Sequence, residues 1–153
     1  MNTLRFFNRQ KTCPINTRFL KAAVQWLLVE VLGEKIYELA IHLIDAPEMT
    51  RLNKNFLQHE GSTDVITFDN REDNQSPPLS GEIFISIPDA QHFARQFQTD
   101  WQSEVTRYII HGILHLKGYD DIKPALRKTM KREENRLLKI LSKKFNLRSV
   151  FKK

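Results

Sequence analysis

The most informative stretch of the sequence is residues 101–122, which read WQSEVTRYIIHGILHLKGYDDI. Asp100 is a good N-cap for a helix, and apolar residues recur at helical spacing from Trp101 to Leu116. Because these residues cover much of the helix circumference, we expect the helix to lie in the protein core. Gly118 can adopt the left-handed conformation that ends a helix, so the chain is expected to turn back there.

Two histidines lie on one face of this predicted helix. His111 and His115 are four residues apart, so their imidazoles are one turn apart and point the same way. The turn after Gly118 brings a carboxylate back toward them, from Asp121 or from its neighbour Asp120. Two imidazole nitrogens and one carboxylate oxygen are the ligand set of an open zinc site, with the fourth position left for water. A hydrogen-bonded pair of core histidines is the alternative interpretation.

The residue after the first histidine argues against a peptidase. Zincin proteases place a glutamate directly after that histidine, where it serves as the general base. Here the position is Gly112. A metal helix of zincin-like spacing is therefore expected to serve a different reaction.

Strands and helices alternate along the rest of the chain. Runs rich in apolar and β-branched residues predict strands at residues 4–7, 35–44, 63–68 and 82–87. Helices are predicted at residues 17–31, after Asp45, from Pro88 and from Pro124, with a loose tail from Phe145. The polar stretch 69–80 reads as an exposed loop. Since no repeat or linker is found, we predict one α+β domain over residues 1–153, a mixed sheet of about four strands with helices packed around it.

Charge is distributed unevenly along the chain. The sequence has a net charge of +6, but residues 123–153 hold twelve Lys and Arg against two acidic residues, which leaves residues 1–122 mildly acidic. A basic end of this kind predicts a polyanionic partner, and a solvated helix face is the alternative. The basic helix and tail begin directly after the histidine motif, so the residues expected to contact the phosphates of such a partner are Lys123, Arg127, Lys128, Lys131 and Arg132.

Composition narrows the cellular setting. No apolar run approaches the eighteen or so residues that a membrane span needs, so no membrane association is expected. The N-terminus shows no secretory signal. Cys13 is the only cysteine and cannot form an internal disulfide, which favours a reducing compartment, the cytoplasm by default.

The motif and its surroundings resemble a known family. HGILHLKGYDD is similar to the signature of the YbeY family of bacterial endoribonucleases, whose members typically read H-G-x-L-H-L-x-G-Y-D-H. The resemblance extends to Leu52-Asn53, to the strand TDVITF at residues 63–68 and to GEIFIS at residues 81–86. Order and spacing agree over residues 35–122.

This resemblance implies a zinc-dependent, single-strand-specific endoribonuclease that acts in small-subunit ribosomal RNA 3′-end maturation and ribosome quality control. It also implies one Zn²⁺ per chain, held by His111, His115 and the residue at position 121. Asp121 stands where the family pattern has a third histidine, and we interpret it as a replacement ligand. Leu57 stands where many members have a phosphate-contacting arginine, so Arg51, Lys54 or His59 would have to supply that contact.

Other classes of function compete with this interpretation. One is a non-catalytic RNA-binding assembly factor with a structural metal site. Another is a hydrolase of a different phosphoester, and a third is a protein-interaction domain with core histidines. Metal content separates the third from the first two, and chelator-sensitive cleavage of single-stranded RNA separates the enzyme from the binding protein. The cleavage position, the general base, the protein partners and the oligomeric state are not predicted by the sequence.

Overall fold

The computed structural model describes residues 2–57, 64–73 and 77–152 and contains a four-stranded sheet. Its strands, in the order β1-β2-β4-β3, are Thr3–Asn8, Tyr37–Ile44, Leu79–Ser86 and Val65–Asp69. The first three run parallel, and β3 is antiparallel to β4. The prediction of an α+β fold with a mixed sheet of about four strands is confirmed.

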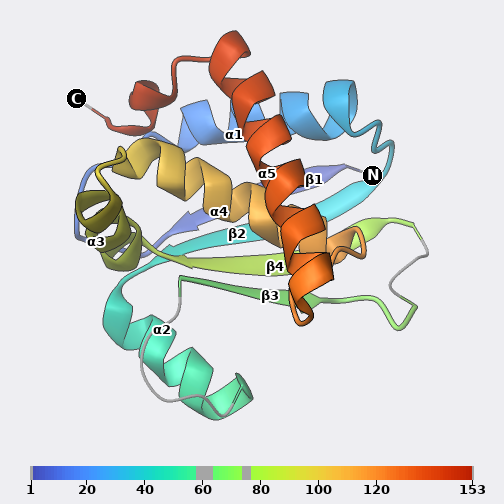
Figure 1. Cartoon of the computed structure of the whole chain (residues 1–153), viewed down its shortest axis with the longest axis horizontal. Helices are drawn as coiled ribbons and strands as arrows, with labels where there is room; N and C mark the ends of the chain where they lie inside the picture. Colours follow the sequence, from blue (N-terminus) through green and yellow to red (C-terminus); the bar gives the residue numbers. More distant parts are fainter. Residues whose placement is uncertain (1, 58–63, 74–76, 153) are drawn as a thin grey trace.

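Helices connect the strands and continue to the C-terminus (Figure 1). The described helices are α1 (Thr17–Trp26) with its π-helical extension η1 (Leu27–Val31), α2 (Ala46–Leu52) with the π-helical η2 (Asn53–Leu57), α3 (Ile87–Phe97), α4 (Trp101–Leu116), α5 (Pro124–Lys144) and the 3₁₀ helix η3 (Leu147–Val150). None of them, in the part of the chain that is described, is long and apolar enough to cross a membrane.

One face of the sheet carries the main core. Alternate residues of β2, namely Leu39, Ile41 and Leu43, point to this face and are buried against α1 and α4, as the period of two in a strand requires. A second apolar cluster joins α1, α4 and α5, so α5 packs as an outer layer over α4 (Figure 1). The helix with the histidine pair is thus held between the sheet and α5.

α4 approaches β4 closely at a glycine. A Cβ atom built on Gly112 would lie 2.7 Å from Cγ2 of Ile83, which is closer than real side chains allow. Ile83 is fully buried in the middle of the sheet. The absence of a side chain at residue 112 therefore sets the spacing between helix and sheet.

The opposite face of the sheet has a smaller core and a buried histidine. Ile44, Met49 and Ile66 form its apolar cluster beneath α2. His42, expected to lie in a strand without metal-ligand neighbours, is stacked between Phe7 and Phe84, with ring centroids 5.0 and 4.1 Å from its own.

The C-terminal tail differs from the expectation of a loose segment. Leu147 and Val150 are buried, and the backbone N–H of Asn16 donates to the Val150 carbonyl at 2.8 Å. A β-bridge also joins Ile15 to Phe151. Two apolar residues three positions apart suffice for one 3₁₀ turn, a pattern too short to be recognised as a helix in sequence. The polar loop is also shorter than predicted, because β4 begins at Leu79.

Candidate metal centre

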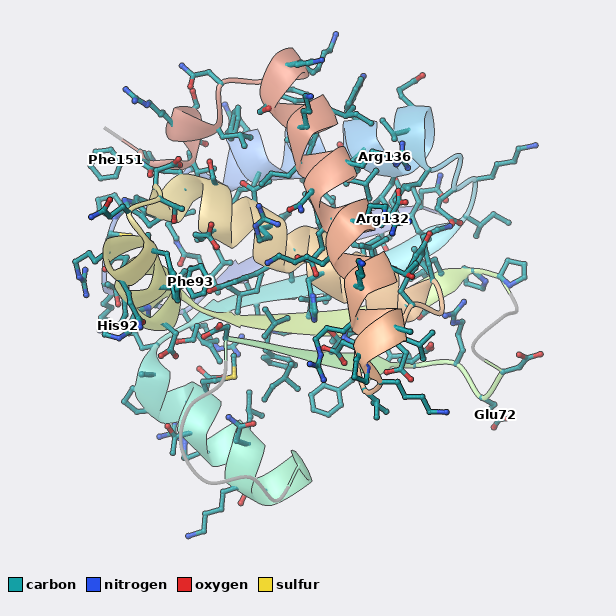
Figure 2. All side chains as sticks on the ribbon, in the orientation of Figure 1. Glu72, His92, Phe93, Arg132, Arg136 and Phe151 are labelled. Carbon is teal, nitrogen blue, oxygen red and sulfur yellow. The ribbon has the colours of Figure 1, made fainter. Side chains whose placement is uncertain are left out.

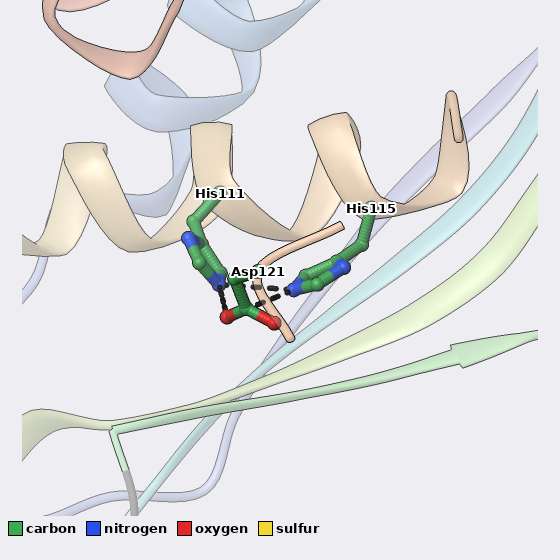
Figure 3. A group of neighbouring side chains, drawn as sticks. All are labelled: His111, His115 and Asp121. Carbon is green, nitrogen blue, oxygen red and sulfur yellow. Dashed lines mark hydrogen bonds and ion pairs between the residues drawn. The ribbon is translucent and has the colours of Figure 1, made fainter. Parts of the chain in front are cut away.

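α4 places both histidines as the sequence predicts. The Asp100 side chain caps the helix by accepting a hydrogen bond from the Ser103 N–H at 2.8 Å. Most of the helix surface is buried, but His111 and His115 lie on its half-buried side, toward α5. Their side chains project in the same direction from successive turns (Figure 3).

The turn after α4 returns the chain to these histidines. Gly118 has φ +102°, a conformation that L side chains rarely adopt, and the next residue donates its N–H back to Leu114 at 3.0 Å. Arg127 of α5 then holds the returning segment, since its Nε donates to the Asp121 carbonyl at 3.2 Å. The neighbouring Asp120 has a different partner, because its Oδ1 accepts the Ile122 N–H at 3.1 Å. Asp121 is the carboxylate left to face the histidines.

The three side chains converge at one point (Figure 3). The two Nε2 atoms are 3.1 Å apart, and each lies 3.6 Å from Oδ2 of Asp121. Bond lengths of 2.0–2.2 Å around a tetrahedral zinc ion correspond to ligand atoms about 3.3–3.6 Å apart. The triangle therefore has the size of a zinc ligand set, and among the described residues it is the group of three or more His, Cys, Asp and Glu side chains with such a geometry.

Hydrogen bonds on the far side of each ring determine which nitrogen faces the triangle as an acceptor. Nδ1 of His111 lies 2.6 Å from Oε2 of Glu134, and Nδ1 of His115 lies 3.1 Å from the Tyr119 carbonyl. Both partners only accept hydrogen bonds, so each Nδ1 carries the hydrogen and each Nε2 of a neutral ring presents a lone pair. Two lone pairs and a carboxylate oxygen facing one another repel. A divalent cation satisfies all three at once, so the donor set fits zinc.

The triangle lies in a cleft of about 410 Å³ between α4, α5, α3 and the start of β3. Its lining combines acidic, basic and aromatic side chains. The residues are Asp64, Val65, Phe93, Glu104, Arg107, Tyr108, His111, His115, Asp121, Arg127, Met130, Lys131 and Glu134.

Burial raises the pKa values of three acidic groups that line the cleft. Burial raises the pKa of Asp64, although the Tyr108 hydroxyl donates to Oδ2 at 3.2 Å and favours its charged form. Burial likewise raises the pKa of Glu104 and of the Tyr108 phenol. Desolvation penalises the charged form of all three groups.

Only some of the basic residues predicted to contact RNA line the cleft. Arg127 and Lys131 line the cleft, whereas Lys123, Lys128 and Arg132 are exposed on other parts of the α5 region. Figure 2 shows Arg132 on the side of α5 that faces away from α3, and Phe93 on α3. His59, named from sequence as a replacement for the missing arginine, lies outside the described residues, as does the side chain of Leu57.

Sequence reasoning missed several cleft residues. Arg107 donates to Asn135 at 2.6 Å and lies 3.6 Å from Glu134, which is 6% exposed. A signal for Glu134 was present, because it occupies the buried face of α5 together with Met130 and Leu137. A charged residue on an apolar face must find a polar partner, here His111.

Comparison with known proteins places these features in a family. The profile described as Endoribonuclease YbeY matches residues 5–142. The chain belongs to the YbeY family of endoribonucleases. Three relatives named Endoribonuclease YbeY come from Parabacteroides distasonis, Chlorobaculum parvum and Salinibacter ruber, with 39%, 35% and 33% identity. The alignments cover 79%, 86% and 72% of this chain and 84%, 90% and 74% of those proteins.

A solved structure shares the fold. The solution structure of TM1509 from Thermotoga maritima superposes with a TM-score of 0.62 over 91% of this chain and 89% of that protein, at 24% sequence identity. Endoribonuclease activity, a hydrolysis of RNA phosphodiesters, is the function that the YbeY family supports for this chain.

Proposed function

We propose that this chain is a zinc-dependent, single-strand-specific endoribonuclease with His111, His115 and Asp121 as metal ligands. The observation that supports this most strongly is the convergence of three acceptor atoms, 3.1 to 3.6 Å apart, inside the cleft. Bound zinc would supply a Lewis acid that stabilises charge on a phosphoryl oxygen and lowers the pKa of a coordinated water. The alternative is an RNA-binding assembly factor with a structural metal. That alternative does not explain why both histidines are only half buried and line the cleft.

The cleft walls suit an RNA strand. Arg127 and Lys131 bring positive charge to the same cleft as the ligands, where they can bind the phosphates on either side of the reacting one. Phe93 lines the cleft and packs against Phe97 with ring centroids 4.5 Å apart, and its other ring face can stack with an unpaired base. Paired bases are already stacked and offer no such contact, which favours single strands.

The wider role follows the family resemblance. We propose ribosomal RNA as the substrate, with cleavage near the 3′ end of the small-subunit RNA and a part in ribosome quality control. A cytoplasmic location stays a prediction from sequence.

The primary experiment measures metal content and cleavage on the same preparation. Protein purified without chelator is expected to hold about one zinc per chain and to cleave a labelled single-stranded RNA, with no cleavage of the matched duplex. His115→Ala should abolish both metal binding and cleavage. His92→Ala removes an exposed histidine of α3 outside the metal triangle and serves as the control. A chain that retains zinc but cleaves no RNA would support the non-catalytic alternative.

A second experiment tests the RNA path with two matched lysines of α5. Lys131 lines the cleft and Lys128 does not, and both are exposed. Each phosphate contact contributes about 0.7 to the slope of log affinity against log salt for single strands. Lys131→Gln should reduce the slope by about that amount, whereas Lys128→Gln should leave it unchanged. Equal effects would show that α5 attracts RNA only through its overall charge.

A further inference from the structure

The two histidines of the metal triangle differ in what lies behind them. His115 donates its Nδ1 hydrogen to a neutral backbone carbonyl, that of Tyr119, at 3.1 Å. His111 donates to the carboxylate of Glu134 at 2.6 Å, a shorter contact, in the direction expected for a hydrogen bond to a charged acceptor. Glu134 belongs to α5 and is 6% exposed. A buried carboxylate is therefore aimed at one ligand only.

A buried carboxylate is costly unless it is paired, and its two oxygens have separate partners. Oε2 faces His111, while Oε1 lies 3.6 Å from Nη1 of Arg107. Arg107 is itself held by Asn135 at 2.6 Å and lies 3.9 Å from Glu104. The positive guanidinium offsets the desolvation of Glu134 and keeps its charge compatible with burial. The arrangement is a chain of contacts from Arg107 through Glu134 to the metal triangle.

We propose that Glu134 is a positioning residue for the metal centre, and this inference rests on the proposed zinc site. Its carboxylate holds the ring of His111 with the hydrogen on Nδ1, so that Nε2 points at the ion as an acceptor. A carboxylate behind a histidine also makes the coordinating nitrogen a stronger ligand. Because Asp121 is partly exposed and lies on a turn, the site depends on a rigid His111 for much of its affinity.

A merely structural role would have a different signature. If Glu134 served only to fasten α5 to α4, its loss would lower the stability of the metal-free protein and leave zinc affinity per folded molecule unchanged. If it positions His111, zinc affinity changes even where stability does not. The two roles are therefore separated by measuring both quantities on the same variants.

The test compares Glu134→Gln with Glu133→Gln. Glutamine keeps a side-chain oxygen that accepts from Nδ1 but removes the charge. Glu133 is the adjacent residue of α5, and its partner is Arg136 rather than a metal ligand. Zinc affinity is measured by competition with a chromophoric chelator, and Co²⁺ absorption spectra report the ligand geometry. Unfolding of the metal-free proteins in urea gives their stability.

Glu134→Gln is expected to weaken zinc binding about 10- to 100-fold, the usual effect of losing such a partner, and Glu134→Ala by more. Glu133→Gln is expected to bind zinc like the wild type. Equal zinc affinity of the wild type and both glutamine variants would overturn the inference while leaving the metal site intact. Absence of zinc binding in the wild type would instead refute the proposed function.

A measurement on the unmodified chain covers the case in which Glu134 variants fail to fold. Nitrogen-15 spectra of the metal-free protein distinguish the two neutral histidine tautomers. His111 is expected to carry its hydrogen on Nδ1. A predominant hydrogen on Nε2 would contradict the positioning role whether or not the variants fold.

Discussion

The close contact between α4 and β4 predicts that Gly112→Ala destabilises the protein. The new methyl group would lie 2.7 to 2.8 Å from three side-chain atoms of Ile83. Ile83 is fully buried, and its strand is paired on both sides, by β2 and β3. The strand cannot retreat, so the helix must move. A second close approach, between Gly81 and the Leu116 side chain, prevents α4 from simply sliding along the sheet.

The expected magnitude is the difference between two terms. Overpacking of a well-packed core costs about 1–3 kcal/mol. Alanine in a helix interior is about 0.5–1 kcal/mol more favourable than glycine. The net loss of unfolding free energy is then about 0–2.5 kcal/mol. We expect the upper half of this range, because the close contacts involve all three outer carbons of Ile83 rather than one flexible end.

Urea unfolding of the metal-free protein in two backgrounds measures this effect. Ile83→Ala alone should cost about 2–5 kcal/mol, and it removes the three atoms that the methyl group would approach most closely. In that background Gly112→Ala is expected to stabilise the protein by about 0.5–1 kcal/mol through helix propensity. The sign of the glycine substitution should therefore reverse. A loss of equal size in both backgrounds would refute the steric reasoning.

Three further predictions test other parts of the structure. Asp121→Ala should lower the zinc content measured by elemental analysis after dialysis. Asp120→Ala should retain zinc, because the Asp120 carboxylate accepts a hydrogen bond from the Ile122 N–H. The reverse result would mean that Asp120, and not Asp121, is the third ligand. Burial lowers the pKa of His42, so the unfolded chain binds that proton more readily and stability falls as pH drops below about 6.5. His42→Gln should lose less stability than the wild type between pH 7.5 and 5.5 in urea titrations, and identical losses would exclude His42 as a cause. Leu147→Ala should cost about 2–5 kcal/mol in the same assay, whereas a negligible cost would mean that the C-terminal turn is not part of the cooperative fold.

Local patterns predicted much of the metal centre. The spacing of His111 and His115 and the glycine after them depend only on the geometry of one helix and its end, so sequence was sufficient to bring them together. The choice between Asp120 and Asp121 was left open by the residues themselves. In the structure the Asp121 carboxylate faces the histidines, and Arg127, six positions away, holds the Asp121 backbone; the role of Asp121 as a ligand stays a prediction.

Contacts between distant segments could not be predicted in the same way. Phe93, Arg107 and Glu134 come from three helices, and their shared cleft depends on how those helices cross. A helical pattern specifies which face is buried but not which side chain of another helix it meets. The same limit applies to Val150, which is buried and whose carbonyl accepts a hydrogen bond from Asn16 in the segment before α1.

The shortness of the segment that carries the proposed ligands has a consequence for folding. His111, His115 and Asp121 lie within eleven consecutive positions, so an unfolded chain still presents them to the same ion. An ion that also binds the unfolded state stabilises the native state by less than its native affinity implies. Glu134 is 23 positions from His111 and reaches it only after α5 has docked. The nascent chain can therefore bind the metal weakly through this local segment before folding is complete. Binding becomes tight only after α5 has docked. Tight zinc binding would then indicate that the chain has folded completely.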